Sequence, residues 1–176
     1  MTSQQLIISG LGGQGILFIT RLLAETAIAK GLPVLTSETH GMAQRGGIVI
    51  SHLKVGVFSS PLVRPGQADG LLALKPENVA LHRHFLRSDG WIVANAVAIA
   101  VVEAQHSTAT IDADPLALAM GDPQSVNLIV LGRALAEPGR LFCTAAEVEK
   151  AIRRKLATRP ALQEGALAAL RAGIEA

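Results

Sequence analysis

Two glycine-rich loops carry most of the residues that could do chemistry in this chain. The first is Gly10-Leu11-Gly12-Gly13-Gln14-Gly15, and the second is the run Glu38-Thr39-His40-Gly41-Met42-Ala43-Gln44-Arg45-Gly46-Gly47. Each loop follows a short apolar run that is typical of a buried strand. Parallel strands release their carboxyl ends at one edge of a sheet, where open α/β sheets bind ligands. We therefore expect both loops to face a single crevice.

The first loop has the spacing G-x-G-x-x-G between an expected strand and an expected helix. Glycines at these positions permit a tight turn and a close approach to a phosphate, and the helix N-terminus offers free N–H groups to an anion. Glu38 follows Gly15 by 23 positions, near the place of the ribose-binding carboxylate in a dinucleotide-binding fold. The pattern predicts a phosphate-bearing ligand, with NAD or FAD as one candidate. A tight strand–helix turn without a ligand stays open as the alternative.

The second loop places polar side chains among glycines, which an ordinary nicotinamide site does not require. Arg45 supplies a planar fork for a carboxylate or a phosphate. Gln44 can both donate and accept hydrogen bonds, and Gly46 and Gly47 allow the backbone to pass close to another body. These residue types favour a binding surface. An ordered loop with Arg45 in a structural salt bridge is the alternative.

The elements that must position the loops alternate between strands and helices. A strand over 6–9, a helix over Ile16–Lys30 ended by Gly31 and a strand over 33–36 form an expected βαβ unit. Later expected elements are strands over 48–57, 70–74, 91–94 and 108–111 and helices over 76–86, 124–136 and about 161–174. The pattern predicts one α/β domain over residues 1–176, a three-layer αβα sandwich with a mainly parallel, Rossmann-like sheet.

Several local signals refine these boundaries. Asp89-Gly90 is expected to be a turn, and Asp114-Pro115 and Asp122-Pro123 each indicate a helix N-cap followed by proline. Thr144-Ala145-Ala146-Glu147 fits a capping box. Asn127, in an apolar stretch, is expected to be a buried polar group bonded to backbone.

Composition excludes several classes of protein. The chain is 49% hydrophobic with a net charge of +2, and its one basic run, 153–155, is expected to be a solvated helix face, so no nucleic-acid partner is indicated. The single cysteine, Cys143, excludes an internal disulfide or a Cys-ligated cluster held by this chain alone, and it is expected to be a small buried hydrophobe. No signal peptide and no apolar run of about 20 residues is evident, so we expect a cytoplasmic protein without membrane contact.

The run from Thr39 to Gly47, followed by Val49-Ile50-Ser51-His52-Leu53, closely resembles the gamma-type domain of the 2-oxoacid:acceptor (ferredoxin) oxidoreductases when taken together with the first loop. Within that family the chain is most similar to the small beta subunit of indolepyruvate oxidoreductase. The resemblance is strong over the first 55 residues. It implies a subunit of an enzyme that oxidatively decarboxylates a 2-oxoacid, here an indolepyruvate or another arylpyruvate, with coenzyme A and passes electrons to ferredoxin.

The resemblance also implies that thiamine diphosphate, Mg and the Fe–S clusters lie on a large partner subunit, so that this chain is inactive alone and reaches ferredoxin through the complex. His40 and Arg45 are then the candidate residues nearest the chemistry, at the mouth of the partner's active site. The candidate ligand-binding residues, with coenzyme A as the leading ligand, are Gly10, Gly12, Gly13, Gln14, Gly15, Glu38, Gly41, Met42, Gln44, Gly46 and Gly47.

Two other functions fit the same residues. A free-standing NAD- or flavin-binding module would bind its cofactor without a partner. A purely structural assembly subunit would use both loops as docking surfaces and could form a homodimer when isolated. The mean hydropathy of +0.38 fits a protein that buries surface in an assembly.

Overall fold

The computed structural model describes residues 3–40, 46–97 and 106–176. Its strands are β1 (Gln4–Leu11), β2 (Val34–His40), β3 (Ile48–Val55), β4 (Ala68–Ala73), β5 (Leu86–Asn95) and β6 (Ser107–Ile111). Its helices are α1 (Ile16–Ala29), α2 (Glu77–His82), α3 (Ala113–Ala119), α4 (Val126–Leu135), α5 (Ala145–Lys155) and α6 (Pro160–Glu175), with short 3₁₀ turns η1 (Arg83–Phe85) and η3 (Pro123–Ser125).

The strands form one six-stranded sheet in the order β2-β3-β1-β4-β5-β6. β1, β4, β5 and β6 run parallel to one another, whereas β3 runs antiparallel to both of its neighbours, β1 and β2. The expected α/β class and mainly parallel sheet are confirmed. The expected βαβ unit is split, because β3 lies between its two parallel strands.

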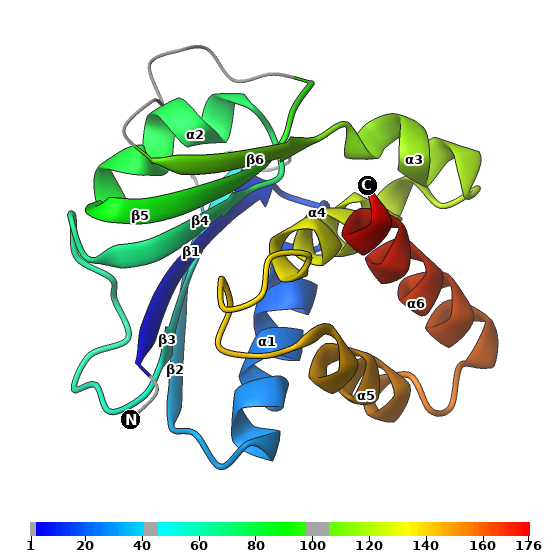
Figure 1. Cartoon of the computed structure of the whole chain (residues 1–176), viewed down its shortest axis with the longest axis horizontal. Helices are drawn as coiled ribbons and strands as arrows, with labels where there is room; N and C mark the ends of the chain where they lie inside the picture. The colour runs from blue at the N-terminus through cyan, green and yellow to red at the C-terminus, as the bar shows by residue number, and fades with distance from the viewer. Residues whose placement is uncertain (1–2, 41–45, 98–105) are drawn as a thin grey trace.

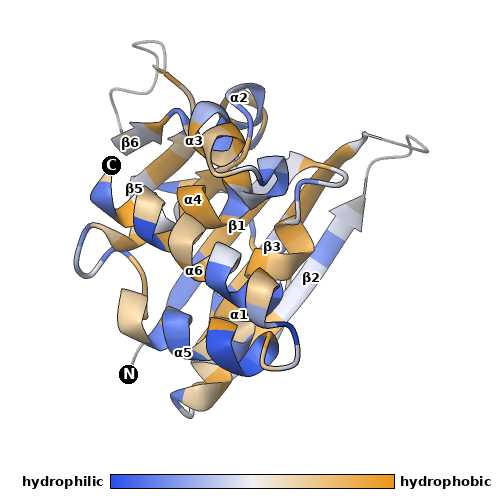
Figure 2. Ribbon diagram, turned by 90° about the vertical axis from the view of Figure 1, so that its right-hand side faces the viewer, coloured by the Kyte–Doolittle hydropathy of each residue, from blue (hydrophilic) through white to orange (hydrophobic). Residues whose placement is uncertain are grey.

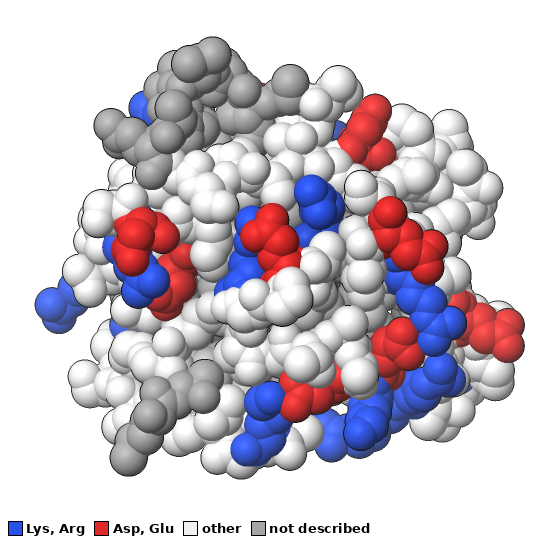
Figure 3. All heavy atoms as spheres, in the orientation of Figure 1, with Lys and Arg blue, Asp and Glu red and all other residues white. Residues whose placement is uncertain are grey.

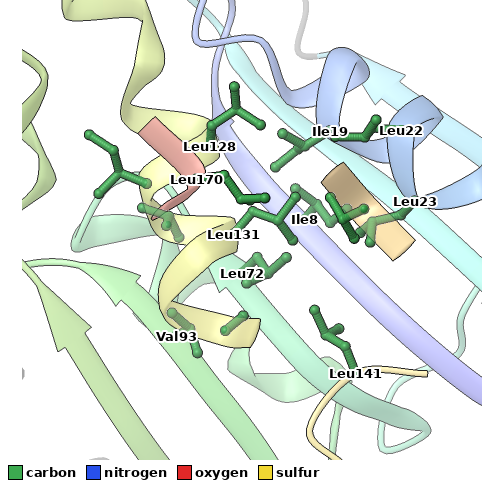
Figure 4. Close-up of a cluster of buried hydrophobic side chains, with 14 of the residues drawn as sticks. Ile8, Ile19, Leu22, Leu23, Leu72, Val93, Leu128, Leu131, Leu141 and Leu170 are labelled. Carbon is green, nitrogen blue, oxygen red and sulfur yellow. The ribbon is translucent and has the colours of Figure 1, made fainter. Parts of the chain in front are cut away.

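Helices cover the two faces of the sheet unequally (Figure 1). α1, α4, α5 and α6 lie on one face, where Ile8, Leu72 and Val93 point into the larger core (Figure 4). The other face is covered by α2 and by the chain between β3 and β4, over a smaller core that includes Ile7 and Leu71. The central strands are coloured as hydrophobic, and the edge strand β2 is more hydrophilic (Figure 2). Such alternation of Ile7 and Ile8 between faces is the expected period of a strand buried on both sides.

Local sequence signals explain several boundaries. Gly31 has φ 71° directly after the C-cap residue Lys30, as expected for a glycine that ends a helix. At the start of α5 the Thr144 side chain accepts from the Glu147 N–H and the Glu147 carboxylate accepts from the Thr144 N–H, so the capping box is confirmed.

Figure 3 shows positive and negative groups alternating along the side of the molecule where α5 lies. The ion pair between Lys30 and Glu147 joins α1 to α5 there.

Two expected boundaries are wrong. Asp89 and Gly90 lie inside β5 rather than in a turn, because β5 advances from Leu86 to Trp91 while its partner β4 advances only from Ala68 to Gly70, which leaves a bulge. Helix α3 begins at Ala113, so Asp114 lies in its first turn instead of capping it. The Asn95 side chain, from β5, accepts from the Ala113 N–H and therefore sets this helix start from outside the helix.

No helix in the described parts of the chain is long and apolar enough to cross a membrane.

Candidate functional site

The two glycine loops meet at one edge of the sheet. The Gly12 N–H donates to the Gly47 carbonyl at 2.9 Å, immediately beyond the last β1–β3 pair, Leu11 with Ile48. β1 and β2 both run antiparallel to β3, so the end of β1, the end of β2 and the start of β3 share this edge. The expectation that the loops adjoin is confirmed for the described residues Gly46 and Gly47.

The first loop is closed by its own glutamine. The Gln14 Oε1 accepts from the Leu11 N–H at 2.7 Å, and the Gln14 N–H donates to the Leu11 carbonyl at 3.1 Å. A Cβ on Gly10 would lie 2.7 Å from the same Oε1, so glycine is required for this closure. A Cβ on Gly12 would meet only ordinary contacts, at 3.7 Å from the Gly47 carbonyl oxygen. Packing within the described chain therefore does not demand glycine at position 12.

Gly15 is the N-cap of α1 and has φ 73°, in the left-handed region that favours glycine. Asn127, in the first turn of α4, donates through Nδ2 to the Gly15 carbonyl at 3.2 Å and accepts at Oδ1 from the Leu128 N–H at 2.6 Å. A Cβ on Gly15 would lie 2.1 Å from that Nδ2. Asn127 is buried and bonded to backbone as expected, and it fixes the glycine loop against α4.

The N-terminus of α1 is free to receive an anion. Gly15 supplies no side-chain cap and the first turn holds no acidic residue. Within the described residues, the N–H groups of Ile16 and Leu17 have no acceptor. These groups carry the partial positive charge of the helix end. A pocket of about 410 Å³ lies beside them and is lined by Leu11, Gly12, Gly13, Gly15, Ile16, Leu17 and Val49.

A second pocket of about 300 Å³ lies on the other side of the loop. Gly13, Gly15 and Phe18 form its wall on the loop side, and Asn127 and Arg159 contribute from α4 and from the residue before α6. Sequence reasoning did not identify Phe18, Arg159 or the apolar lining of the first pocket as part of this site. Phe18 lies three positions after Gly15, and the apolar lining lies beside the same glycines, whereas Arg159 lies 32 positions after Asn127 and has no comparable signal in the sequence.

Glu38 lies on β2, where it pairs with Ser51 of β3, which in turn pairs with Ile8 of β1. Two strand spacings, about 10 Å, therefore separate its backbone from β1. In a dinucleotide-binding fold the carboxylate follows a strand adjacent to the first one. The inserted β3 thus places Glu38 farther from the glycine loop than the dinucleotide interpretation needs.

The remaining candidates belong to the second loop. The backbone of His40 ends β2 opposite Val49, while its side chain and the residues Gly41, Met42, Gln44 and Arg45 lie outside what the structure describes. Their expected roles remain predictions.

A buried polar network supports the end of β1 from the opposite face. The Ser9 Oγ is 2.8 Å from His82 Nδ1 and accepts from Asn78 Nδ2 at 2.9 Å. Burial lowers the pKa of His82, and the neighbouring His84 lowers it further, with a hydrogen bond to the Asn78 backbone opposing both. Because Ser9 is fully buried, this contact joins α2 to β1 and does not expose a nucleophile.

Histidine, cysteine, aspartate and glutamate are the side chains that could ligate a metal ion. The described residues contain no cluster of three or more His, Cys, Asp or Glu side chains suited to a metal ion. Burial, with a smaller contribution from the Glu147 charge, raises the pKa of Cys143 to about 12, so its thiol stays protonated and is a poor metal ligand.

Several known proteins resemble this chain in sequence and in fold. Residues 5–176 match the family described as pyruvate ferredoxin/flavodoxin oxidoreductase. The chain is 30% identical to the indolepyruvate oxidoreductase subunit IorB of Pyrococcus horikoshii, over 88% of this chain and 86% of the relative. It is 40% identical to the IorB subunit of Archaeoglobus fulgidus over 90 residues, which span 51% of this chain and 45% of that relative.

The fold also matches a solved structure. The chain superposes with a TM-score of 0.79 and 18% identity on a 2-oxoglutarate:ferredoxin oxidoreductase from Magnetococcus marinus solved with 2-oxoglutarate, coenzyme A and succinyl-CoA, over 99% of this chain and 31% of that longer one. At this identity the likeness shows the fold alone. The family match over almost the whole sequence and the IorB relatives establish that the chain belongs to the pyruvate ferredoxin/flavodoxin oxidoreductase family.

Proposed function

We propose that this chain is the small, IorB-like subunit of a 2-oxoacid:ferredoxin oxidoreductase that converts an arylpyruvate such as indolepyruvate to its acyl-CoA. The family match and the names of the relatives support the subunit assignment. The aryl substrate rests on the same names. A cytoplasmic location is part of the proposal.

We further propose that the glycine-loop edge binds the phosphates of coenzyme A. The observation that carries this is the uncapped N-terminus of α1 beside the joined loops and the 410 Å³ pocket. Among the described residues, the backbone N–H groups of Gly13, Gly15, Ile16 and Leu17 are the donors available to a phosphate, because those of Gly12 and Gln14 already bond within the two loops. Gln14 holds the loop closed through Oε1, so its proposed part is to shape the cradle.

The second loop would extend this surface toward the partner. From their residue types, Arg45 is proposed to meet the carboxylate of the oxoacid or a phosphate, and His40 and Gln44 to contact the mouth of the partner's active site. Gly41 and Met42 would lie between them.

We propose that this chain itself holds none of the cofactors. The protonated Cys143 thiol argues against cluster ligation, so we assign thiamine diphosphate, Mg and the Fe–S clusters to a large partner subunit. There they would supply decarboxylation and electron transfer to ferredoxin. The role left to this chain is to bind and orient coenzyme A and to narrow access to the site, and we expect it to be inactive alone.

The position of Glu38, beyond β3, makes the alternative of a free-standing NAD or flavin module less favourable. The alternative of a purely structural subunit differs in one measurable respect, because it predicts no effect of loop variants on the Michaelis constant for coenzyme A.

The experiment is co-expression with a candidate large subunit, followed by 2-oxoacid-dependent reduction of a viologen dye with and without coenzyme A. Gly12→Ala tests the cradle, because its Cβ meets only ordinary contacts within the chain but would stand where a phosphate approaches. We expect the KM for coenzyme A to rise at least tenfold with little change in melting temperature. The matched control is Gly165→Ala, whose Cβ would meet nothing within 4 Å on α6.

Two results would contradict these proposals separately. An active complex in which Gly12→Ala leaves the KM for coenzyme A unchanged removes the cradle but keeps the subunit. A chain that forms no complex and instead binds NAD or a flavin removes the subunit proposal.

Arg45→Ala is expected to raise the KM for coenzyme A or for the oxoacid, and unchanged kinetics would exclude its proposed role.

A further inference from the structure

A third pocket, with a polar lining, lies at the opposite end of the sheet from the glycine loops. Its volume is about 480 Å³, and it is lined by Gln5, Lys54, Phe58, Ser59, Ser60, Arg64, Pro65 and Gln67. Gln5 of β1 and Lys54 of β3 are register partners and therefore share one face of the sheet. Gly12 is seven residues further along the chain than Gln5, which corresponds to roughly 23 Å of strand. This pocket is thus separate from the coenzyme A site proposed above.

The floor of the pocket is a buried lysine without a counterion. Lys54 is only 7% exposed, and its Nζ lies 5.0 Å from the centroid of the Phe58 ring. Among the residues that the structure describes, Lys54 Nζ has no hydrogen-bond or ion-pair partner. Most of the Lys54 side chain is buried, and its ammonium faces the pocket, where an anion or a set of acceptors would compensate its partial loss of hydration. A cation–π contact offsets only part of this cost.

The surroundings increase the positive charge. The pocket is also lined by Arg64, at its exposed rim, and by no acidic residue. Asp69, which lies beside Gln5, accepts from the Gln5 N–H and pairs with Arg87. Burial lowers the pKa of Lys54, and the charge of Arg64 lowers it further. Two cations thus share a cavity that no carboxylate neutralises in the described chain.

The neutral lining completes a set of donors. Ser59, Ser60, Gln5 and Gln67 also line the pocket, and their side chains carry hydroxyl and amide groups that can donate hydrogen bonds. Charge-assisted hydrogen bonds from lysine and arginine to phosphate or carboxylate oxygens are among the stronger polar contacts in proteins. The volume falls in the usual range for small-molecule sites, and it exceeds what one acidic side chain would fill.

We propose that the pocket around Lys54 and Arg64 binds the oxyanion of a small phosphorylated or carboxylated molecule. The ammonium of Lys54, carried on a largely buried side chain, is the anchor, and the guanidinium of Arg64 closes the site from the rim. The site does not depend on the coenzyme A proposal, because it uses different residues at the other end of the sheet.

The test measures the melting temperature of the full chain in inorganic phosphate, with sodium chloride at equal ionic strength as the reference and citrate as a carboxylate probe. At ten times the dissociation constant we expect a rise of about 3–6 °C. Lys54→Met and Arg64→Gln should each abolish this rise. Lys155→Met, which removes a lysine paired with Glu25 on the helical face, should retain it.

The melting temperature of Lys54→Met in chloride shows whether this variant still folds. Replacing a cation without a counterion, on a largely buried side chain, by an apolar chain of similar length should leave the melting temperature in chloride unchanged or higher. Loss of the phosphate effect in a variant that melts at least as high as wild type would therefore support the site.

Three results would overturn the proposal. One is an absence of any rise with phosphate or citrate in the wild-type chain. Another is a full rise in Lys54→Met. The third is an absence of small-anion binding combined with weaker assembly of Lys54→Met with the large subunit, which would show that a carboxylate of the partner neutralises Lys54 instead.

Discussion

Gly15→Ala tests how the glycine loop is held, because two separate costs act at this position. The backbone φ of 73° makes any residue with a Cβ strained by about 1–2 kcal/mol. The new Cβ would also lie 2.1 Å from Asn127 Nδ2, so Asn127 must move and give up its bonds to Gly15 and Leu128. Leaving a buried amide unsatisfied costs about 1–3 kcal/mol. We expect a total loss of about 2–5 kcal/mol in the free energy of unfolding.

A double-mutant cycle separates the two costs. Asn127→Ala alone should lose about 1–3 kcal/mol, since it removes the same hydrogen bonds. In the double variant those bonds are lost only once, and the backbone strain at Gly15 remains. The double variant should therefore be more stable than the sum of the single losses predicts, by about 1–3 kcal/mol.

The assay is equilibrium urea unfolding of the wild type, both single variants and the double variant, with equal m-values as the check that the transitions are comparable. Additive losses, within about 0.5 kcal/mol, would refute the contact between Gly15 and Asn127 as the source of the cost. A loss below about 1 kcal/mol for Gly15→Ala would refute the strain argument as well.

Three further predictions concern other parts of the chain. Cys143 should resist a thiol-specific reagent at pH 8 until the chain unfolds, because its pKa is raised to about 12, and rapid labelling of the native chain would contradict its burial. The pKa of Glu147 is lowered, chiefly by its hydrogen bond with Lys30, so its stabilising effect is present above the unfolded-state pKa of about 4.3 and is lost as the pH falls through the lower folded value. Glu147→Gln should accordingly destabilise the chain more at pH 7 than at pH 3 in thermal melts, and an equal effect at both pH values would contradict the pairing. Thr144→Ala should cost about 0.5–2 kcal/mol of unfolding free energy, and a wild-type urea midpoint would show that the capping box contributes nothing.

Local signals were sufficient for much of the fold. The helix after Gly15, its end at Gly31 and the capping box at Thr144 depend on residues within a few positions of one another, so the sequence predicts them correctly. The wrong boundaries have distant causes. The bulge that absorbs Asp89 and Gly90 reflects pairing between β4 and β5, and the start of α3 is set by Asn95, which accepts from Ala113 across 18 residues.

The candidate site shows the same division. The positions of the glycines predicted the tight turn at the end of β1 and the uncapped start of α1. The meeting of Gly12 with Gly47 was expected, but β3 lying between β1 and β2 was not. Period-2 hydrophobic patterns show that a strand is buried without showing which strand lies beside it, since pairing partners are chosen by the whole sheet.

By itself the sequence determined the family, the α/β class and the turns that only glycine can form, because these depend on residue type and spacing. Tertiary structure alone decided that Asn127 reaches the Gly15 carbonyl across 112 residues. It also decided that Glu38 stands one strand beyond β3 and that Lys54 is buried beside Arg64 without a counterion among the described residues. Burial and charge balance are properties of everything packed around a side chain, and no stretch of neighbouring residues contains that information.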